Sequence, residues 1–552
     1  MTTAVANHVE LSKTPLAEFR NEPVRDFSRA AVREDFRNAI AKLRERFPLD
    51  APLVIDGKPV RTKEVIAVRS PNDTSLVVGE SGSAGIEDTD RTIAAAKNAF
   101  ASWSQTDAGD RAAFLLKAAE VCRQRRDELS ALMVHEAAKP WREADADTCE
   151  AIDFLEYYAR EALRLGERRP LQRHVLGERN ELYYQALGVV GVIGPWNFPM
   201  AIPVGMMAAA VAAGNTVVWK PAEQTPLIAH LVMKIMEDCG LPRGVVNYLP
   251  GRGEVCGQRL LESTDVQMIA FTGSREVGLH ILKECNTVRP GQRFVKRVVA
   301  EMGGKNALIV DSSADLDSVI PDVLYSAYGF SGQKCSACSR LIVVEDVYDE
   351  LLPRLREGVA SLKIAPSTDP GCQVNAVIDE DAKAKVLEYI AIGREEGTEL
   401  YVAEVGELAE KGHFVPPAVF TDVAPDARLA QEEVFGPVLA VIKARDFDHA
   451  LEIANGTDYA LTGGVHSRTL EHLEAAKTRL QCGNLYLNRT ITGAIVGRQP
   501  FGGFRMSGIG SKAGGPDYLK QFLVARSATE NLMRHGFAPL DEGDGPRDEH
   551  FD

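Results

Sequence analysis

One cysteine near the middle of the chain has neighbours that suit a reactive thiol. Cys335 follows Gly332, Gln333 and Lys334 in a predicted turn. The adjacent cation favours the thiolate, which is the nucleophilic form of the side chain. Cys335 is therefore the candidate nucleophile, whereas each of the other cysteines is better explained as a small buried residue.

Cys335 and Cys338 also form a CxxC pair, which is half of a common zinc or redox site. The chain has nine cysteines, but no second CxxC and no nearby pair of histidines completes a zinc site. We therefore expect neither a metal site nor a disulfide framework.

Two other polar side chains suit the chemistry of a thiol nucleophile. Glu301 opens the run EMGGK and is a candidate general base, and Asn197 in the run PWNFP is a candidate oxyanion donor. Each also has a plainer interpretation, because a lone Glu is often a solvated surface charge and an Asn between a strand and a helix often caps the helix. The residues alone leave both alternatives open.

A second group of residues suits a nucleotide. Lys220 ends a predicted strand, and Glu223 follows three residues later, where it suits ribose hydroxyls or else forms an exposed ion pair. Gly273 and Ser274 open a predicted helix, whose first N–H groups suit an anion. The nearby glycines do not form GxGxxG, so this signal is weak by itself.

Predicted strands and helices alternate around these residues. The alternation indicates a doubly wound α/β domain with a parallel sheet, and a second α/β segment runs from a strand at 307–310 to about residue 480. In the first segment we expect strands at 188–193, 216–219, 245–249 and 266–271, and helices at 200–213, 226–238 and 276–284.

The remaining elements surround this core. Apolar residues at helical spacing predict a helix over 32–43, Asp56 and Gly57 predict a hairpin turn, and long helices follow from 89 to about 165. Segments 178–187 and 522–529 are predicted strands that suggest exchange between subunits. The acidic end of the chain, 537–552, is predicted to be a mobile tail.

Composition excludes several other classes of protein. The net charge of −15 argues against broad binding to nucleic acid or to an anionic membrane. No run reaches the roughly 18 apolar residues of a membrane span, and the first 13 residues lack the pattern of a secretory signal. We therefore expect a cytoplasmic enzyme that acts on a small molecule.

Seven motifs in order resemble those of the aldehyde dehydrogenase superfamily, over about residues 50 to 530. The resemblance implies an α/β fold with a Rossmann-type NAD-binding domain, an α/β catalytic domain and a small β oligomerisation arm. The motifs are PWNF from Pro195, WKP from Trp219, FTGS from Phe271, EMGGK from Glu301, GQKC from Gly332, EEVFGP from Glu432 and PFGG from Pro500.

Within that superfamily, three segments are similar to the 1-pyrroline-5-carboxylate dehydrogenases: 332–340, 488–497 and 135–158. This closer resemblance implies NAD-dependent oxidation of L-glutamate γ-semialdehyde to L-glutamate in proline catabolism, through a thiohemiacetal and a thioester on Cys335. Asn197 would stabilise the oxyanion, and Glu301 would activate water. The alternatives are an enzyme of the same mechanism acting on another small acidic semialdehyde, and a non-catalytic nucleotide-binding relative.

The resemblance also assigns binding residues. For the cofactor it implies Trp196, Lys220, Glu223, Gly273, Ser274, Glu433 and Phe435. For the substrate it implies Glu150 near the amino group, Ser336, Gly493 and Ala494 at the distal carboxylate, and Phe198 and Phe501 along the aliphatic chain. Glu223 disfavours a 2′-phosphate by like charge, so NAD is expected rather than NADP.

The predicted elements and the resemblance together divide the chain into an expected set of parts. A homo-oligomer, either a dimer or a trimer of dimers, is expected by resemblance. The parts are an N-terminal helical arm at 1–50, an NAD-binding domain at 51–165 and 188–300, a catalytic domain at 301–485, an oligomerisation arm at 166–187 and 509–536, and the tail at 537–552.

Overall fold

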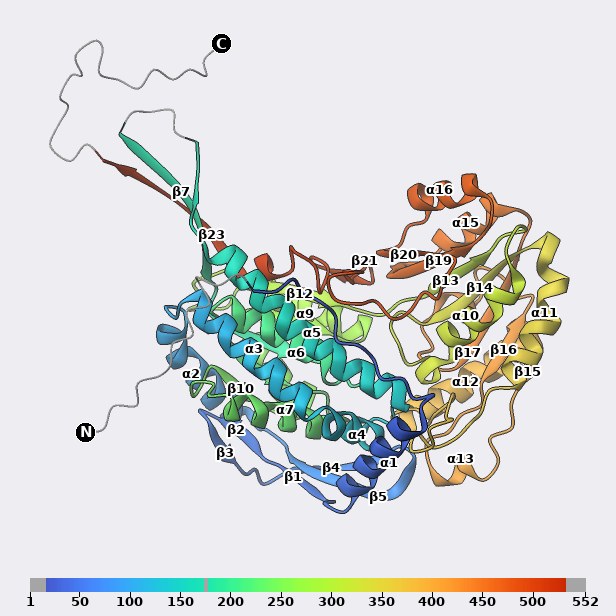
Figure 1. Ribbon diagram of the computed structural model, residues 1–552, viewed down its shortest axis with the longest axis horizontal. Coiled ribbons are helices and arrows are strands. Elements are labelled where there is room, and N and C mark those ends of the chain that lie inside the picture. The colour runs from blue at the N-terminus through green and yellow to red at the C-terminus, as the bar shows by residue number, and fades with distance from the viewer. Residues whose placement is uncertain (1–15, 173–176, 533–552) are drawn as a thin grey trace, which may run out of the picture.

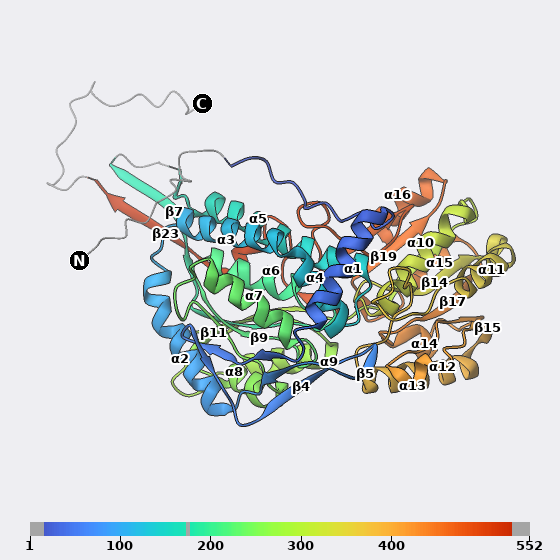
Figure 2. The same cartoon turned by 60° about the horizontal axis from the view of Figure 1, so that its bottom comes forward.

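A computed structural model describes residues 16–172 and 177–532 (Figure 1). Two α/β parts lie side by side, each built around its own sheet, and a narrow β arm projects from the larger part (Figures 1 and 2). The predicted tail at 537–552 lies outside the described residues. Within the described residues, no helix combines the length and the apolar character needed to cross a bilayer.

The larger part contains an eight-stranded sheet whose five central strands are parallel. The α/β fold predicted from the sequence is confirmed. Antiparallel strands extend the sheet at both edges. The strand order is β22 (Gly508–Ile509), β12 (Arg297–Glu301), β11 (Val266–Thr272), β8 (Val189–Ile193), β9 (Thr216–Lys220), β10 (Val246–Tyr248), β2 (Leu53–Ile55) and β3 (Lys58–Val60).

Helices cover both faces of this sheet because its strands are apolar on both sides. In β9, Val217 and Trp219 pack into one apolar cluster and Val218 packs into another, as the two-residue period of a strand requires. On the first face lie α3 (Ala108–Gln124), α4 (Arg126–Glu136), α5 (Trp141–Gly166), α6 (Ala201–Ala212) and α7 (Pro226–Asp238). On the second face lie α2 (Ile86–Trp103), α8 (Gln258–Glu262) and α9 (Arg275–Cys285).

The smaller part contains a seven-stranded sheet that is parallel except for its edge strand β15. Its strand order is β15 (Thr398–Val402), β16 (Ala418–Thr421), β17 (Val438–Ala444), β14 (Cys338–Val344), β13 (Asn306–Val310), β19 (Thr462–His466) and β20 (Asn484–Leu487). Its helices are α10 (Leu316–Tyr328), α11 (Glu345–Ala360), α12 (Glu380–Glu396), α13 (Leu408–Lys411), α14 (Arg428–Gln431), α15 (Phe447–Asn455) and α16 (Leu470–Arg479).

The N-terminal region joins the core of the larger part. Helix α1 (Ala30–Arg44) buries Phe36, Ile40 and Leu43, as its apolar spacing predicts. The hairpin turn at Asp56 and Gly57 is also confirmed, and both residues have positive φ. The sequence analysis missed a second small sheet of β1 (Leu49–Ala51), β5 (Asp73–Gly82) and β4 (Val65–Ser70).

The projecting arm is a three-stranded antiparallel sheet. Strands β7 (Glu178–Ala186) and β23 (Leu523–Asn531) pair along their whole length, and β6 (Arg169–Pro170) adds a short third strand. Both predicted strands are therefore confirmed as strands, and within one chain they pair with each other.

Candidate active site

The loop before Cys335 has an unusual backbone that fixes the position of the thiol. Phe330, Ser331 and Gly332 all have positive φ, at 54°, 54° and 68°, which is a strained run for residues with a side chain. Contacts from elsewhere stabilise it: the Ser331 hydroxyl donates to the Asn375 carbonyl at 2.8 Å. A Cβ on Gly332 would lie 2.3 Å from the Gly436 carbonyl oxygen, so the close approach requires glycine.

Cys335 lies between two cavities and lines both of them. The larger cavity, of about 900 Å³, extends from the ends of β8 and β9 to α9. The smaller cavity, of about 100 Å³, is bounded by α5, α6 and the loop at 493–496. The thiol can therefore meet one ligand from each side.

All the residues expected to bind the cofactor line the larger cavity, together with Asn197. They are Trp196, Lys220, Glu223, Gly273, Ser274, Glu433 and Phe435. The cavity lies at the carboxyl ends of parallel strands, where open α/β sheets bind ligands. Its size and its mixture of apolar walls with a few polar groups fit a dinucleotide.

Lys220 and Glu223 lie together at the mouth of this cavity. The Lys220 ammonium is buried and lies 3.8 Å from Glu223 Oε1. Glu223 Oε1 also accepts a hydrogen bond from the Gly253 amide at 2.8 Å. The two interpretations from the sequence are thus compatible, because this ion pair also faces the cavity.

Ser274 caps the helix that points its N-terminus into the cavity. Its hydroxyl accepts a hydrogen bond from the Val277 amide at 3.3 Å, at the start of α9. This N-terminus presents further N–H groups, which suit an anionic group of a ligand.

Glu433 and Phe435 approach the cavity beside Cys335. Glu433 Oε1 accepts a hydrogen bond from the Gly304 amide at 2.8 Å, and a Cβ on Gly303 would lie 2.1 Å from Glu433 Oε2. The glycines of the EMGGK motif therefore let this carboxylate lie against the backbone. The Phe435 ring packs edge-on against Trp196, with 5.5 Å between centroids.

The residues expected to bind the substrate all line the smaller cavity. Glu301 and Cys335 also line it. The expected substrate residues that line it are Glu150, Phe198, Ser336, Gly493, Ala494 and Phe501. Burial raises the pKa of Glu150 to about 8, and the neighbouring Asp147 adds to this effect.

Glu301 is buried beside Cys335 instead of being a solvated surface charge. It ends β12 and has a side chain that is largely inaccessible to solvent. Its Oε2 accepts a hydrogen bond from the Gly503 amide at 3.3 Å, while its Oε1 has no hydrogen-bond partner among the described residues. Burial raises the pKa of this carboxyl to about 8, as suits a proton acceptor near neutral pH.

The expectation that Lys334 favours the Cys335 thiolate is wrong. The Lys334 side chain is buried and pairs with Glu143, with 2.8 Å between Nζ and Oε1. Burial, together with the nearby Glu433 and Glu301 carboxylates, raises the pKa of Cys335 to about 12. These surroundings therefore favour the thiol form of Cys335 over the thiolate.

Cys338 is separated from the chemistry by its place in the fold. It begins β14, is buried, and directs its thiol to the Arg340 carbonyl at 3.5 Å. Across residues 16–172 and 177–532, no group of three or more His, Cys, Asp or Glu side chains is placed to hold a metal ion.

A buried charge network that the sequence did not predict lies close to Asn197 and Lys334. Lys139 Nζ donates to the Asn197 carbonyl at 2.6 Å and to Asp147 Oδ2 at 3.0 Å. It also lies 3.9 Å from the centre of the Phe198 ring. The only signal in the sequence is the four-residue spacing of Lys139, Glu143 and Asp147, which equally describes an exposed helix face.

The fold and the site together define the class of the protein. Residues 59–528 match the aldehyde dehydrogenase family, and the chain belongs to that family.

The similar proteins include named dehydrogenases. The chain is 49% identical to a 1-pyrroline-5-carboxylate dehydrogenase of Geobacillus kaustophilus, over 93% of this chain and 99% of that protein. The chain also matches a crystal structure of 1-pyrroline-5-carboxylate dehydrogenase from Thermus with bound NAD, at 46% sequence identity and a TM-score of 0.91. The match covers 94% of this chain and all of that one. Proline utilization A of Bdellovibrio bacteriovorus is 46% identical with a TM-score of 0.92, and the match covers 95% of this chain and 54% of that longer chain.

Proposed function

We propose that this chain is an NAD-dependent dehydrogenase that oxidises L-glutamate γ-semialdehyde to L-glutamate. The observation that carries the proposal is the position of Cys335, which lines both a large cavity suited to a dinucleotide and a small cavity suited to an aldehyde. Curated relatives at 46 to 49% identity bear the name 1-pyrroline-5-carboxylate dehydrogenase.

The Cys335 thiol first gives up its proton to solvent water, and the thiolate sulfur then attacks the aldehyde carbon, which gives a thiohemiacetal with negative charge on the former carbonyl oxygen. Asn197 Nδ2 donates one hydrogen to the Gln333 carbonyl at 3.0 Å, so its second amide hydrogen is available to that oxygen. The Cys335 backbone N–H is the second donor. Lys139 supports the arrangement because it holds the Asn197 carbonyl.

NAD, when bound, accepts the hydride that leaves the thiohemiacetal carbon. Lys220 and Glu223, which line the larger cavity, would hold the adenosine ribose, Ser274 would contact the pyrophosphate, and Glu433 and Phe435 would position the nicotinamide ribose and ring. Two further residues line the larger cavity: Trp196, which packs against Phe435, and Gly273. The Glu223 carboxylate opposes a 2′-phosphate, which accounts for NAD over NADP.

Glu301 completes the reaction by accepting a proton from the water that hydrolyses the thioester. Its unpartnered Oε1 and its raised pKa suit this role. Water oxygen bonds to the acyl carbon, the carbon–sulfur bond breaks, and Cys335 is regenerated with release of the acid.

In this proposal, the smaller cavity selects a substrate that carries a carboxylate. Gly493 has φ of +76°, and a Cβ at this position would meet nothing within 4 Å, so its backbone is open to the cavity. Backbone N–H groups here and the Ser336 hydroxyl would bind the substrate carboxylate. Phe198 and Phe501 would flank the aliphatic chain, and Glu150 would face the amino group.

The parts of the chain have corresponding roles in this proposal. Residues 51–165 and 188–300, which supply most of the larger sheet, would form the NAD-binding domain, and 301–485 would form the catalytic domain. The arm of β6, β7 and β23 leaves an exposed β edge and would join a second subunit in a dimer or a trimer of dimers in the cytoplasm.

The test is steady-state NADH formation with L-glutamate γ-semialdehyde, compared with an uncharged aliphatic aldehyde of equal chain length and with other acidic semialdehydes. The proposal expects the highest kcat/KM for L-glutamate γ-semialdehyde. A higher value for another acidic semialdehyde would keep the mechanism and change the substrate, and no NADH with any aldehyde would refute the activity.

A further inference from the structure

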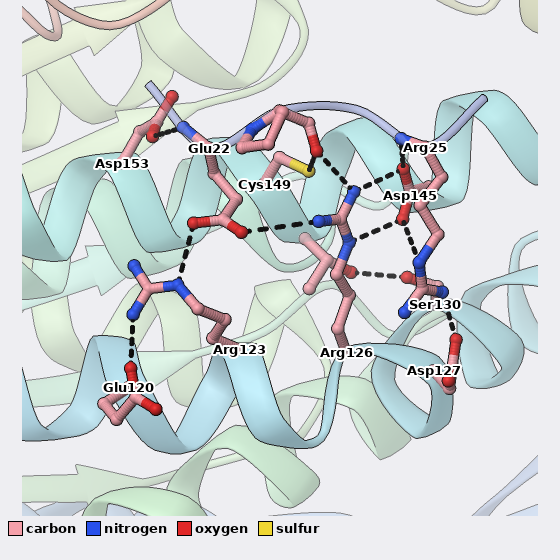
Figure 3. Close-up of polar contacts among 12 residues, drawn as sticks. Glu22, Arg25, Glu120, Arg123, Arg126, Asp127, Ser130, Asp145, Cys149 and Asp153 are labelled. Atoms are coloured by element: carbon pink, nitrogen blue, oxygen red, sulfur yellow. Dashed lines mark hydrogen bonds and ion pairs between the residues drawn. The ribbon is translucent and has the colours of Figure 1, made fainter. Parts of the chain in front are cut away.

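An extended segment before the first helix lies against α3, α4 and α5, and α5 forms one wall of the substrate cavity. We call residues 16–29 the strap, because they cross α3, α4 and α5 without forming a helix or strand of their own. The strap runs over these helices before the chain enters α1 (Figures 1 and 3). The proposed chemistry uses none of its residues.

The strap is attached through its backbone to buried side chains. The Arg25 amide donates to Asp145 Oδ2 at 2.8 Å, and Asp145 is itself held by two hydrogen bonds of 2.7 Å from Arg126. Arg126 also donates to the Pro23 carbonyl at 2.9 Å. Glu22 extends the attachment through ion pairs with Arg123 and Arg126 (Figure 3). The strap therefore adds hydrogen bonds to a buried ion pair of Arg126 with Asp145, which fixes its path over the helices.

At one point the strap reaches beyond these helices to the loop that lines the substrate cavity. The Asn21 side-chain amide donates to Asp153 Oδ2 at 2.9 Å and to the Val496 carbonyl at 2.8 Å. One side chain therefore joins α5 to the loop at 493–497. Asp153 is also fixed to the strap because it accepts a hydrogen bond of 2.7 Å from the Glu22 amide.

Phe19 makes a second, apolar link between α5 and the same loop. Its ring packs edge-on against Tyr157, with 5.3 Å between centroids. A Cβ added to Gly497 would lie 3.1 Å from Phe19 Cε1, so the ring lies against this glycine. Gly497 and Gly493 both have positive φ. The loop residues between them, 494–496, line the cavity.

We infer that Asn21 and Phe19 are positioning residues for the substrate, and that the strap sets the enzyme's preference for an aldehyde that carries a carboxylate. The inference rests on the proposed function, because it takes the 493–497 loop as the carboxylate site. Asn21 and Phe19 touch the far side of this loop and do not line the cavity. They act by holding the loop amides in place, since a charge-assisted hydrogen bond depends on donor geometry.

The test compares two substrates in the full-length enzyme: L-glutamate γ-semialdehyde and an uncharged aliphatic aldehyde of equal chain length. In Asn21→Ala, kcat/KM for the semialdehyde is expected to fall about tenfold, mainly through KM, because one loop-fixing hydrogen bond is lost. The uncharged aldehyde should change less than about twofold by the same argument. Phe19→Ala should give the same difference between the substrates, with Asn21 intact.

Arg25→Ala is the matched control, because it removes a strap side chain that pairs with Asp127 and Asp145 on the helices and not with the loop. It should leave the preference unchanged, with a thermal midpoint close to that of Asn21→Ala. An equal loss on both substrates, or no loss in either loop variant, would overturn the inference alone. If the wild type itself shows no preference for the semialdehyde, the proposed function fails first and the inference fails with it.

Discussion

Glu301 and Lys512 contact opposite ends of one peptide group. The Gly503 amide donates to Glu301 Oε2 at 3.3 Å, and the Gly502 carbonyl of the same peptide accepts a hydrogen bond of 2.6 Å from Lys512 Nζ. The cation therefore acts on the carboxylate both through space and by polarising the intervening amide.

This relationship predicts a change in pH dependence. Burial raises the pKa of Glu301 to about 8, and Lys512 opposes that rise. Because Glu301 must be deprotonated to accept a proton, acid release should increase as the pH rises through about 8. In Lys512→Met the opposing cation is lost, so the profile should move to more alkaline pH. Rates of thioester hydrolysis measured across pH would show this, and an acid shift would contradict it.

Replacing Glu301 with Gln should separate the two halves of the reaction. The amide cannot accept a proton from the attacking water. The first hydride transfer should therefore be normal, and the thioester should then accumulate. Pre-steady-state absorbance should then show a burst of NADH followed by slow turnover. If the burst itself is lost, Glu301 acts earlier, on the thiol.

The two cysteines of the CxxC pair should behave differently. Cys335→Ala should abolish oxidation and leave NAD binding unchanged in a fluorescence titration, because the thiol forms the covalent bond and the cofactor residues remain. Cys338→Ala should retain most of the activity, since its thiol lies in β14 and contacts the Arg340 carbonyl. Comparable loss of activity in both variants would indicate that the pair acts as a unit.

Gly493→Val should weaken binding of the semialdehyde, which carries a carboxylate, more than binding of an uncharged aldehyde. Its φ of +76° is unfavourable for a branched residue, so the loop amides should move. The expected loss is about 1.5 to 3 kcal/mol, the range for a hydrogen bond to a charged group. Measured KM should rise for the semialdehyde and change little for an uncharged aldehyde. An equal rise for both would mean that the loop only shapes the cavity.

Breaking the ion pair between Glu143 and Lys334 should destabilise the fold. Both side chains are buried, and removing one partner of such a pair costs about 3 to 5 kcal/mol. Glu143→Gln should therefore lower the midpoint of denaturant unfolding. A double variant with Lys334→Met should recover part of that loss, because no unpaired buried charge remains. An unchanged midpoint in the single variant would show that water reaches Lys334.

Much of the fold followed from patterns along the chain. The alternating strands and helices of 188–284 and the apolar spacing in α1 predicted elements that the structure contains, because a strand and a helix impose different periods on buried residues. The small sheet containing β4 and β5 was missed. Its strands are only partly buried, so their apolar pattern is weak.

The sequence by itself determined the candidate chemical groups, because nucleophilicity, basicity and amide donation belong to residue types such as Cys335, Glu301 and Asn197. Only the tertiary structure decided how these groups are charged and held. Lys334 is the neighbour of Cys335 along the chain, but its ammonium pairs with Glu143, which lies 191 residues earlier. Electrostatic interactions depend on distance through space and on burial, and adjacency in sequence specifies neither.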